Sequence, residues 1–455
     1  EGAKKKQEAR LEKILAAADE TNLTFEATGI DYLTVDEAHE FKNLHTPTSI
    51  AGAFIEGSEK ATDMELKINY LRQTYGERVV TMATGTPIAN SISEAHVMTR
   101  YLRPDLLEEA GVRAFDQWGS TFGETVTRVE RDAAGRLKQR TRFAKFKNVP
   151  EMLSSWQQFA DVKRAEDLNL PVPEQVVNSN GDRRPEMVVI PRTEAHAQYM
   201  EYLEGRLDKL SGRPEKGEDN HLTVYNDGRQ VALDPRMVGL EFSGDVKLNY
   251  VTRRIAQIWR ENRDNEYLVP GTPDVSEHKG GLQLVFCDLS TPTDDEWNAY
   301  DQMKSDLAAK HGMDRSRIRF IHEAKDDEKR ANLFRDAREG RIDVLIGSSQ
   351  KMGTGANIQN RAVAMHHVDC PWRPDQLEQR EGRILRQGNE NSEVQIYRYA
   401  TENTFDSTSW DIIGRKATAI AQVMRGRLDV RELDDPGDLA LDAQQMMAGS
   451  SGNPL

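Results

Sequence analysis

Four short segments of this 455-residue chain carry side chains that could act on a phosphoryl group. The first is residues 35–39 (Val-Asp-Glu-Ala-His), which directly follow a short β-prone run. An acidic residue at the end of a buried strand can hold Mg²⁺ through water, and its neighbour can orient or deprotonate an attacking water. An Asp-Glu pair would equally suit a solvated surface, so Asp36 and Glu37 alone leave both interpretations open.

The second segment is residues 83–90 (Ala-Thr-Gly-Thr-Pro-Ile-Ala-Asn), again after a β-prone run. Its glycine and proline force a turn, and the hydroxyls of Thr84 and Thr86 can bridge neighbouring groups. The same residues would also serve an ordinary strand-to-helix turn in which Thr86 caps the helix.

The third segment, residues 347–357, is rich in glycine. Gly353 and Gly355 would let the backbone approach a ligand closely, and Thr354 offers a hydroxyl to a phosphate. Glycine-rich turns without a ligand are common, so this segment is suggestive rather than specific.

The fourth segment, residues 376–388, contains Gln379, Arg383 and Arg386. If the segment is helical, this spacing of i, i+4 and i+7 places the three side chains on one face. Two converging arginines suit the charge that develops on a transferred γ-phosphoryl group. A helix covered with surface ion pairs is the alternative, because Glu378 and Glu381 are available partners.

Alternating strands and helices are expected to position these segments, which is the pattern of parallel sheets with helices on both faces. The sequence predicts strands at 30–35, 78–83, 282–287, 318–321, 344–346, 362–368 and 394–399, and helices at 63–75, 150–166, 193–210, 245–262, 294–311 and 325–338. Residues 168–191 are predicted to be a linker or irregular crossover, and residues 211–235 an exposed loop. The adjacent His366 and His367 should point to opposite faces of their strand, which makes them poor joint metal ligands.

Residues 124–147 are predicted to form a basic β-hairpin around the turn at residues 132–135. Eight basic and two acidic residues between Val126 and Lys147 give this stretch a net charge of +6. Such a hairpin could contact nucleic-acid phosphates through Arg136, Lys138 and Arg140. A solvated basic hairpin without a ligand is the alternative.

The composition sets the limits within which these segments can act. The chain has 61 basic and 75 acidic residues, a net charge of -14, so nucleic-acid contact must come from local patches rather than bulk charge. The absence of any apolar stretch of roughly 20 residues excludes an integral membrane protein. Two cysteines, Cys287 and Cys370, cannot form a disulfide framework or a cysteine-built zinc site, which indicates a reducing compartment.

Taken together, the order and spacing of the segments resemble the superfamily-two helicases. Residues 36–43 resemble their magnesium-binding Asp-Glu-Ala-His box, with the Lys-Asn extension typical of Swi/Snf-type motors. Residues 84–90 resemble the third motif of these motors, and residues 366–374, leading into 379–386, resemble their late motifs. The resemblance is closer still to bacterial phage-, plasmid- and mobile-element-borne helicases fused to adenine-specific DNA methylases. That group carries runs similar to residues 142–151, 226–229 with 232–236, and 397–406, so the resemblance covers about residues 1–430.

The resemblance implies an α/β protein with two RecA-like parallel-sheet lobes and an accessory helical and hairpin insertion. The boundaries it implies are 1–110 for the C-terminal part of the first lobe, 111–244 for the insertion and linker, 245–430 for the second lobe, and 431–455 for a disordered tail. The activity it implies is ATP-dependent movement on duplex DNA in the bacterial cytoplasm, with ATP and Mg²⁺ as cofactors and no membrane contact.

The resemblance also assigns roles to individual residues. Asp36 would lie in the magnesium shell, Glu37 would be the catalytic base, and His39, Thr84 and Thr86 would couple the nucleotide to DNA. In the second lobe, Gly353, Gly355, Asn357 and Gln379 would bind the nucleotide, and Thr354 would couple it to DNA. Arg383 and Arg386 would be catalytic, with Arg386 the favoured arginine finger.

One expected motif is absent from the sequence, the phosphate loop Gly-x-x-x-x-Gly-Lys-Ser/Thr that cradles the β- and γ-phosphates. Residues 57–62 lack its second glycine, and residues 414–417 do not follow a predicted strand. Because the chain begins with Glu1, we expect it to be the C-terminal portion of a longer polypeptide, with the loop in the missing N-terminal portion, which could also carry a methylase domain. The chain alone should then hydrolyse little ATP. A catalytically inactive remnant that binds DNA or a partner is the alternative, whereas a methylase is disfavoured because its Pro-Pro-Tyr-type motif is missing.

Overall fold

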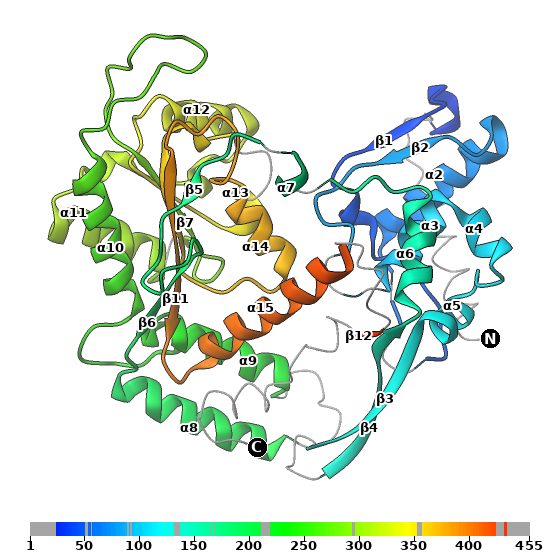
Figure 1. The fold of residues 1–455 in the computed structure, drawn as a ribbon. Coiled ribbons are helices and arrows are strands. Elements are labelled where there is room, and N and C mark those ends of the chain that lie inside the picture. Colours follow the sequence, from blue (N-terminus) through cyan, green and yellow to red (C-terminus); the bar gives the residue numbers. More distant parts are fainter. Residues whose placement is uncertain are drawn as a thin grey trace. The chain divides into compact units, whose positions relative to one another are not determined.

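The computed structural model describes residues 24–50, 53–55, 57–88, 91, 93–131, 137–163, 165–168, 170–210, 219–293, 296–352, 357–424 and 432–434. The chain divides into two compact units (Figure 1). The first unit comprises Glu1–Thr125, Lys145–Ala160 and Leu428–Glu432, and the second comprises Val126–Ala144, Asp161–Arg427 and Leu433–Leu455.

The first unit contains a parallel strand pair packed on helices. Strands β1 (Leu33–Val35) and β2 (Val80–Met82) are paired in register, with Leu33 opposite Val80. Helices α2 (Glu59–Tyr75) and α3 (Glu94–Leu102) contribute the core residues Ala61, Ile68, Val97 and Tyr101. The shorter helices of this unit are η1 (Glu26–Thr28), η2 (Ala38–Phe41), α4 (Pro104–Glu109), α5 (Phe115–Phe122) and α6 (Val149–Gln157).

The predicted basic hairpin is present as two strands. Strand β3 (Gly123–Arg131) lies next to β4 (Leu137–Lys147) in a three-stranded sheet that ends with β12 (Glu432–Asp434). The turn between β3 and β4, including Arg136, lies outside the described residues, as do the side chains of Lys138 and Arg140.

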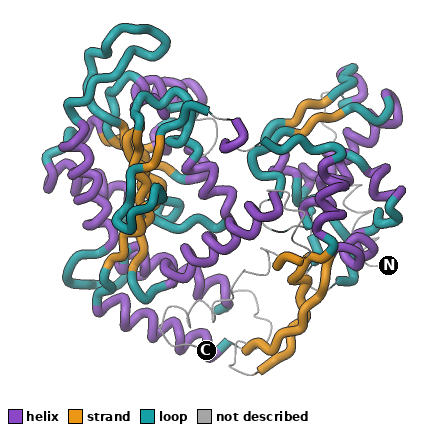
Figure 2. Tube along the Cα trace, in the orientation of Figure 1, coloured by secondary structure: helices purple, strands orange, loops and turns teal. Residues whose placement is uncertain are grey.

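The second unit is built on a seven-stranded sheet in which every pairing is parallel. Figure 2 shows the strands of this sheet in orange, with helices in purple beside them. The order is β5-β11-β10-β7-β9-β8, and β6 also pairs with β11. The strands are β5 (Glu174–Gln175), β6 (Glu186–Ile190), β7 (Leu282–Phe286), β8 (Ile318–Phe320), β9 (Val344–Gly347), β10 (Ala362–His367) and β11 (Glu393–Thr401). Because all strands run the same way, the residues that follow β7, β9 and β10 meet at one edge of the sheet.

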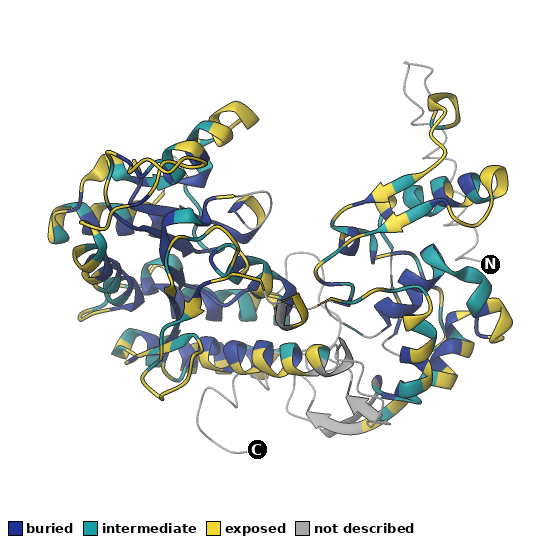
Figure 3. Cartoon of the chain, turned by 45° about the horizontal axis from the view of Figure 1, so that its top comes forward, coloured by how far each residue is buried: buried dark blue, intermediate teal, exposed yellow. Residues whose placement is uncertain are grey.

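Helices cover both faces of this sheet, and the central strands are buried throughout (Figures 1 and 3). Helices α10 (Lys247–Asn262) and α11 (Ala299–His311) pack with Val285 in one apolar cluster. Helix α12 (Asp327–Arg338) packs with Leu284 in the other. Neighbouring strand residues therefore enter different clusters, as their alternation predicts. The predicted α/β fold with parallel sheets is confirmed.

The shorter α-helices described in this unit are α7 (Ala165–Leu168), α13 (Ser349–Met352) and α14 (Pro374–Glu381), and its described 3-10 helices are η3 (Pro235–Val238), η4 (Arg315–Arg317), η5 (Ile321–Glu323) and η6 (Gln359–Arg361). Among the described residues, none of the helices is both long and apolar enough to cross a membrane.

Two sequence predictions of irregular structure in this unit are wrong. Residues 168–191 contain β5 and β6, which extend the sheet by pairing with β11. Within residues 211–235 the structure has helix α9 (His221–Leu233), which packs against α8 (Glu194–Lys209) and α15 (Phe405–Met424). Tertiary packing outweighs local composition here. The composition of these segments does not reveal their structure, because they pair or pack with elements that are distant in the sequence.

Candidate functional site

The acidic segment of the first unit lies where β1 ends. Glu37 has a left-handed backbone conformation (φ 51°), and its N–H donates to Oδ1 of Asp36 at 2.8 Å. The N–H of Ala38 then donates to the carbonyl of Ala83 at 3.0 Å, which ties the turn to the neighbouring strand β2. The turn leaves the Asp36 side chain exposed and 44% of the Glu37 side chain exposed. Strained backbone of this kind is typical of functional turns, and here it presents two carboxylates at the edge of the sheet.

His39 joins this acidic segment to the turn that follows β2. Its imidazole is 3% exposed, and Nδ1 lies 3.0 Å from Oγ1 of Thr84 and 3.4 Å from Oε2 of Glu37. The same Thr84 hydroxyl accepts the N–H of Thr86 at 3.1 Å. The structure therefore brings together the five residues that the sequence singled out in this unit: Asp36, Glu37, His39, Thr84 and Thr86.

A buried ion pair supports the segment from behind. Nζ of Lys42 lies 3.2 Å from Oε1 of Glu94, and both side chains are less than a tenth exposed. Lys42 follows η2, whereas Glu94 begins α3, so the pair fixes the turn after the acidic segment to the helix after the threonine turn.

These residues fit a magnesium ion held through water. The Asp36 carboxylate is exposed and has one oxygen oriented by the Glu37 N–H. Within the described residues no group of three or more His, Cys, Asp or Glu side chains could hold a metal by itself. An ion here would thus depend on water and phosphate oxygens, which is the usual way that Mg²⁺ is bound in phosphoryl-transfer sites.

In the second unit, part of the glycine-rich segment can be placed. Gly353, Thr354 and Gly355 lie outside the described residues. Asn357 is exposed, and its carbonyl accepts a hydrogen bond from Nη1 of Arg338 in α12 at 3.1 Å. The loop that follows β9 is therefore held at its far end by a helix of the same unit.

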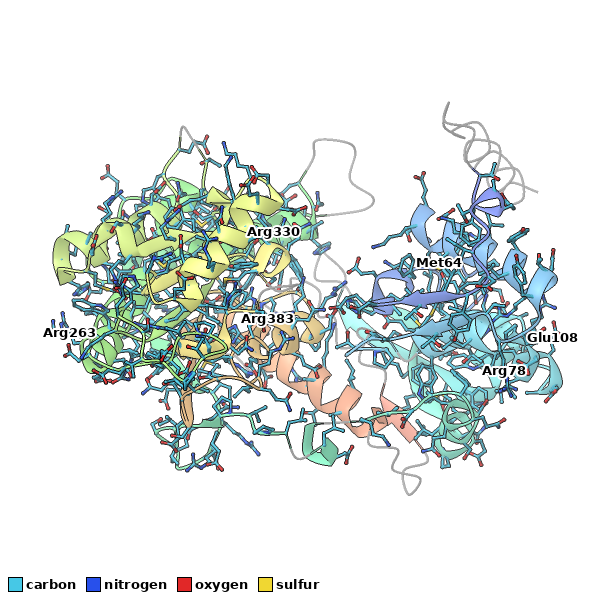
Figure 4. The ribbon with its side chains drawn as sticks, turned by 90° about the horizontal axis from the view of Figure 1, so that it is seen from above. Met64, Arg78, Glu108, Arg263, Arg330 and Arg383 are labelled. Carbon is cyan, nitrogen blue, oxygen red and sulfur yellow. The ribbon has the colours of Figure 1, made fainter. Side chains whose placement is uncertain are left out.

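The arginine segment departs from the predicted geometry. Gln379 lies in α14, but that helix ends at Glu381, so Arg383 and Arg386 follow it in a series of turns. Arg383 (labelled in Figure 4) donates its backbone N–H to the carbonyl of Arg380 at 3.0 Å. The prediction that Gln379, Arg383 and Arg386 share one helical face is therefore wrong. Gly382, a poor helix former, marks the point where the helix stops.

Arg380, which none of the sequence motifs singled out, is the centre of a buried polar network. Its guanidinium is fully buried and donates to the Ser349 hydroxyl at 2.7 Å, to the Asp288 carboxylate at 2.7 Å and to the Asp369 carboxylate at 3.2 Å. Asp288 follows β7, Ser349 follows β9 and Asp369 follows β10. The network thus joins three strand ends at one edge of the sheet. The spacing of Arg380 from the apolar Leu377 and Ile384, both buried, was a signal that it faces the core.

The two carboxylates in this network have different environments. Burial opposes ionisation of Asp288, but the charge of Arg380 and hydrogen bonds from Ser349 hold its pKa below the usual range. Burial and the nearby charge of Asp288 raise the pKa of Asp369. Oδ2 of Asp369 accepts the backbone N–H groups of Asp288 and Leu289, at 2.6 and 2.7 Å. The network is therefore both charged and closely hydrogen-bonded.

The adjacent histidines of β10 have separate partners, as predicted. His366 lies 2.9 Å from the hydroxyl of Tyr399 and 3.1 Å from Oε1 of Gln283, whereas His367 lies 3.4 Å from Oε1 of Glu381. Burial lowers the pKa of His366 to about 3 and that of His367 to about 4. Burial opposes ionisation of Glu381, but His367 and Arg398 lower its pKa to about 2.

Comparison with known proteins agrees with these arrangements in both units. Residues 1–164 match a family model described as "Probable helicase domain", and residues 266–388 match the helicase conserved C-terminal domain. Both units of the chain are helicase-like. The helicase C-terminal match spans β7 to β10 and the segment from Gln379 to Arg386.

Two curated relatives extend the match. Defense against restriction protein B of Escherichia phage P1 is 19% identical over 95% of this chain and 24% of its own length. The uncharacterized ATP-dependent helicase YqhH of Bacillus subtilis (strain 168) is 38% identical over 22% of this chain and 17% of its own length. The chain thus spans about a quarter or less of the length of these relatives. The crystal structure of the DUF1998 helicase MrfA bound to DNA is similar over 39% of this chain and 20% of its own, with 14% identity and a TM-score of 0.27.

Proposed function

We propose that the chain is part of an ATP-dependent DNA helicase or translocase, to which both units contribute residues for ATP hydrolysis. The observation that carries the proposal is the hydrogen bond between His39 and Thr84. It joins an exposed acidic pair at the end of β1 to a hydroxyl-rich turn at the end of β2. An acidic residue that orients water needs a rigid support, and this bond supplies one. The helicase matches in both units support the same conclusion.

In the first unit we assign Asp36 to the water shell of a magnesium ion and Glu37 to the catalytic base. With ATP bound, the ion would neutralise charge on the phosphates. The Glu37 carboxylate would orient the attacking water and accept its proton. His39, which contacts both Glu37 and Thr84, would transmit a change at the carboxylate to the threonine turn and so to DNA.

In the second unit we assign Gln379, Arg383 and Arg386 to the nucleotide, with Arg386 as the arginine finger. The Arg380 network anchors the segment that carries them, so their position need not depend on a continuous helix. Gly353, Gly355 and Asn357 would line the nucleotide site, and Thr354 would couple it to DNA. Arginine fingers stabilise charge in the transition state, which makes their placement decisive for the rate.

DNA is the proposed track, and the motif extensions favour a Swi/Snf-type motor related to the methylase-fused helicases of mobile elements. The lysine of the Lys-Asn extension after the acidic box, Lys42, forms the buried ion pair with Glu94. We propose that Arg136, Lys138 and Arg140 in the β3–β4 hairpin contact DNA phosphates, and that the protein acts in the bacterial cytoplasm.

Substitution of Glu37 by Gln in the complete natural polypeptide tests the proposal. Glu37→Gln keeps the shape of the side chain but cannot accept a proton. We expect DNA-stimulated ATP hydrolysis to fall by roughly 10²–10⁴-fold, as for loss of a general base, whereas binding of a fluorescent ATP analogue is retained.

Glu59→Gln is the matched control, because Glu59 is an exposed glutamate in the first turn of α2 and, among the residues that the structure describes, forms no ion pair with a site residue named above. This variant should hydrolyse ATP at the rate of the unaltered protein. An unaltered polypeptide without DNA-stimulated hydrolysis, or a Glu37→Gln variant of normal rate, would overturn the proposed function.

A further inference from the structure

One face of helix α9 packs against the loop that follows β10, at the edge of the sheet in the second unit. Tyr225, Gly228 and Arg229 occupy positions i, i+3 and i+4 of α9 and therefore share a face. Arg229 and Tyr225 contact the loop that follows β10, at Cys370 and Trp372. The helix belongs to the stretch between the two helicase-family matches, so its role is not set by either of them.

Arg229 makes the polar contact in this interface. Its side chain is 4% exposed, and Nη2 donates to the carbonyl oxygen of Cys370 at 2.6 Å. The guanidinium also lies 4.6 Å from the ring centroid of Trp372. A buried charge that donates to a backbone carbonyl and covers an indole fixes that peptide more firmly than apolar packing would.

Tyr225 and Gly228 hold α9 in place for this contact. The Tyr225 ring lies 4.9 Å from Trp372 and stacks at 5.8 Å on Phe405, the first residue of α15. A Cβ atom on Gly228 would lie 2.2 Å from the Phe405 ring, so the two helices approach as closely as glycine permits. The contacts of Tyr225 and Gly228 with Phe405 therefore oppose rotation of α9 about its axis.

The loop that Arg229 holds is one peptide away from the arginine network. Cys370 directly follows Asp369, and the Asp369 carboxylate accepts a hydrogen bond from Arg380. The backbone carbonyl of Asp369 also accepts from Nη1 of Arg380, at 3.0 Å. A shift of the Cys370 peptide would therefore displace an anchor of the segment that continues to Arg383 and Arg386.

We propose that Arg229 is a positioning residue, through which the accessory helix α9 sets the loop at residues 369–373 and hence the arginine segment. The expected effect on ATP hydrolysis rests on the proposed function, whereas the expected effect on the loop at residues 369–373 does not. Helix α9, which belongs to the accessory insertion at residues 111–244, would then contribute to catalysis by the second unit. Its displacement would lower the rate of ATP hydrolysis without removing any group that touches ATP.

The test compares Arg229→Met with Arg236→Met in the complete natural polypeptide. Arg236 is the matched control, because its guanidinium also lies over a tryptophan, 4.3 Å from the ring of Trp297, and pairs with Asp234 in the same accessory region. Assays are run at temperatures equally far below the melting point of each variant. We expect Arg229→Met to lower kcat by about tenfold or more, the effect of losing a charge-assisted hydrogen bond that positions the transition state, with KM for ATP changed less than about twofold.

A conservative replacement separates positioning from general stability. Arg229→Lys keeps a buried cation that can donate to the Cys370 carbonyl, so it should recover a large part of kcat. Recovery by Lys, together with a normal kcat for Arg236→Met, is the result that positioning predicts. Equal losses of kcat in Arg229→Met and Arg236→Met would overturn the inference.

Hydrogen exchange measures the structural consequence without any activity. In the 455-residue chain, Arg229→Met should speed amide exchange several-fold in peptides from residues 369–386, whereas Arg236→Met should leave these peptides unchanged. Unchanged exchange in Arg229→Met would overturn the inference even if the polypeptide hydrolyses ATP. Faster exchange in a polypeptide that does not hydrolyse ATP would overturn the proposed function and leave the positioning role supported.

Discussion

Arg380 and Arg386 belong to the same segment but differ in burial, and this difference predicts how each replacement affects stability. Arg380 is fully buried between two carboxylates, whereas Arg386 is exposed. Arg380→Met would leave Asp288 and Asp369 without their cation. We expect the free energy of unfolding to fall by about 3–5 kcal/mol, the typical cost of breaking a buried pair from one side. Arg386→Met should change it by less than about 0.5 kcal/mol. Urea unfolding of the 455-residue chain measures both values, and equal effects would contradict this assignment.

The positions of the candidate residues at strand ends were predicted better than their surroundings. The acidic pair and the two threonines were each predicted to follow a strand, and the structure joins the two segments through His39. Arg380 was missed because a charged residue is normally expected at the surface, and its spacing from Leu377 and Ile384 is the one local sign of burial in a largely polar segment. Its ligands come from three strand ends far apart in the sequence, and only the assembled sheet brings these together.

At the scale of elements, the different surroundings of two helix glycines predict opposite effects of their substitution. Gly228→Ala would place a methyl group against the Phe405 ring, so we expect a loss of about 1–3 kcal/mol of stability from overpacking. Gly205 lies in α8, and a Cβ atom added there would meet no neighbouring side chain or other element within 4 Å. Gly205→Ala should therefore add about 0.5–1 kcal/mol through helix propensity. Thermal unfolding of the two variants decides the matter, and destabilisation by both would refute the packing argument.

The elements that the sequence missed depend on partners distant along the chain. Gly228 suggests a break in a polar stretch, yet it lies inside α9. Glycine is required there because the Phe405 ring occupies the space that a side chain would fill. Strand β6 likewise has two exposed residues in five and gains its place by pairing with β11. The central strands were predictable because their residues are apolar on both faces, as buried parallel strands require.

For the whole molecule, histidines buried in both units predict that stability falls as the solution becomes more acidic. Burial lowers the pKa of His96 in the first unit to about 4, and the pKa values of His366 and His367 in the second are about 3 and 4. An unfolded chain protonates its histidines near pH 6.5. Between pH 6.5 and about 4 the unfolded state therefore binds protons that the folded state does not, and the free energy of unfolding must decrease as pH is lowered.

Each such histidine should contribute a slope of up to ~1.4 kcal/mol per pH unit in this window, with its full contribution present above pH 6.5. Urea unfolding of the 455-residue chain at pH 7, 6 and 5 measures the slope. His366→Gln removes one titrating group while an amide can still face Tyr399 and Gln283, so the variant should have a shallower dependence on pH in the transition of the second unit. The low pKa of Glu381 adds a loss in the same direction, but only below its ordinary value of 4.5. A stability that does not change between pH 7 and 5 would show that these histidines are accessible to protons in the folded chain, which their burial forbids.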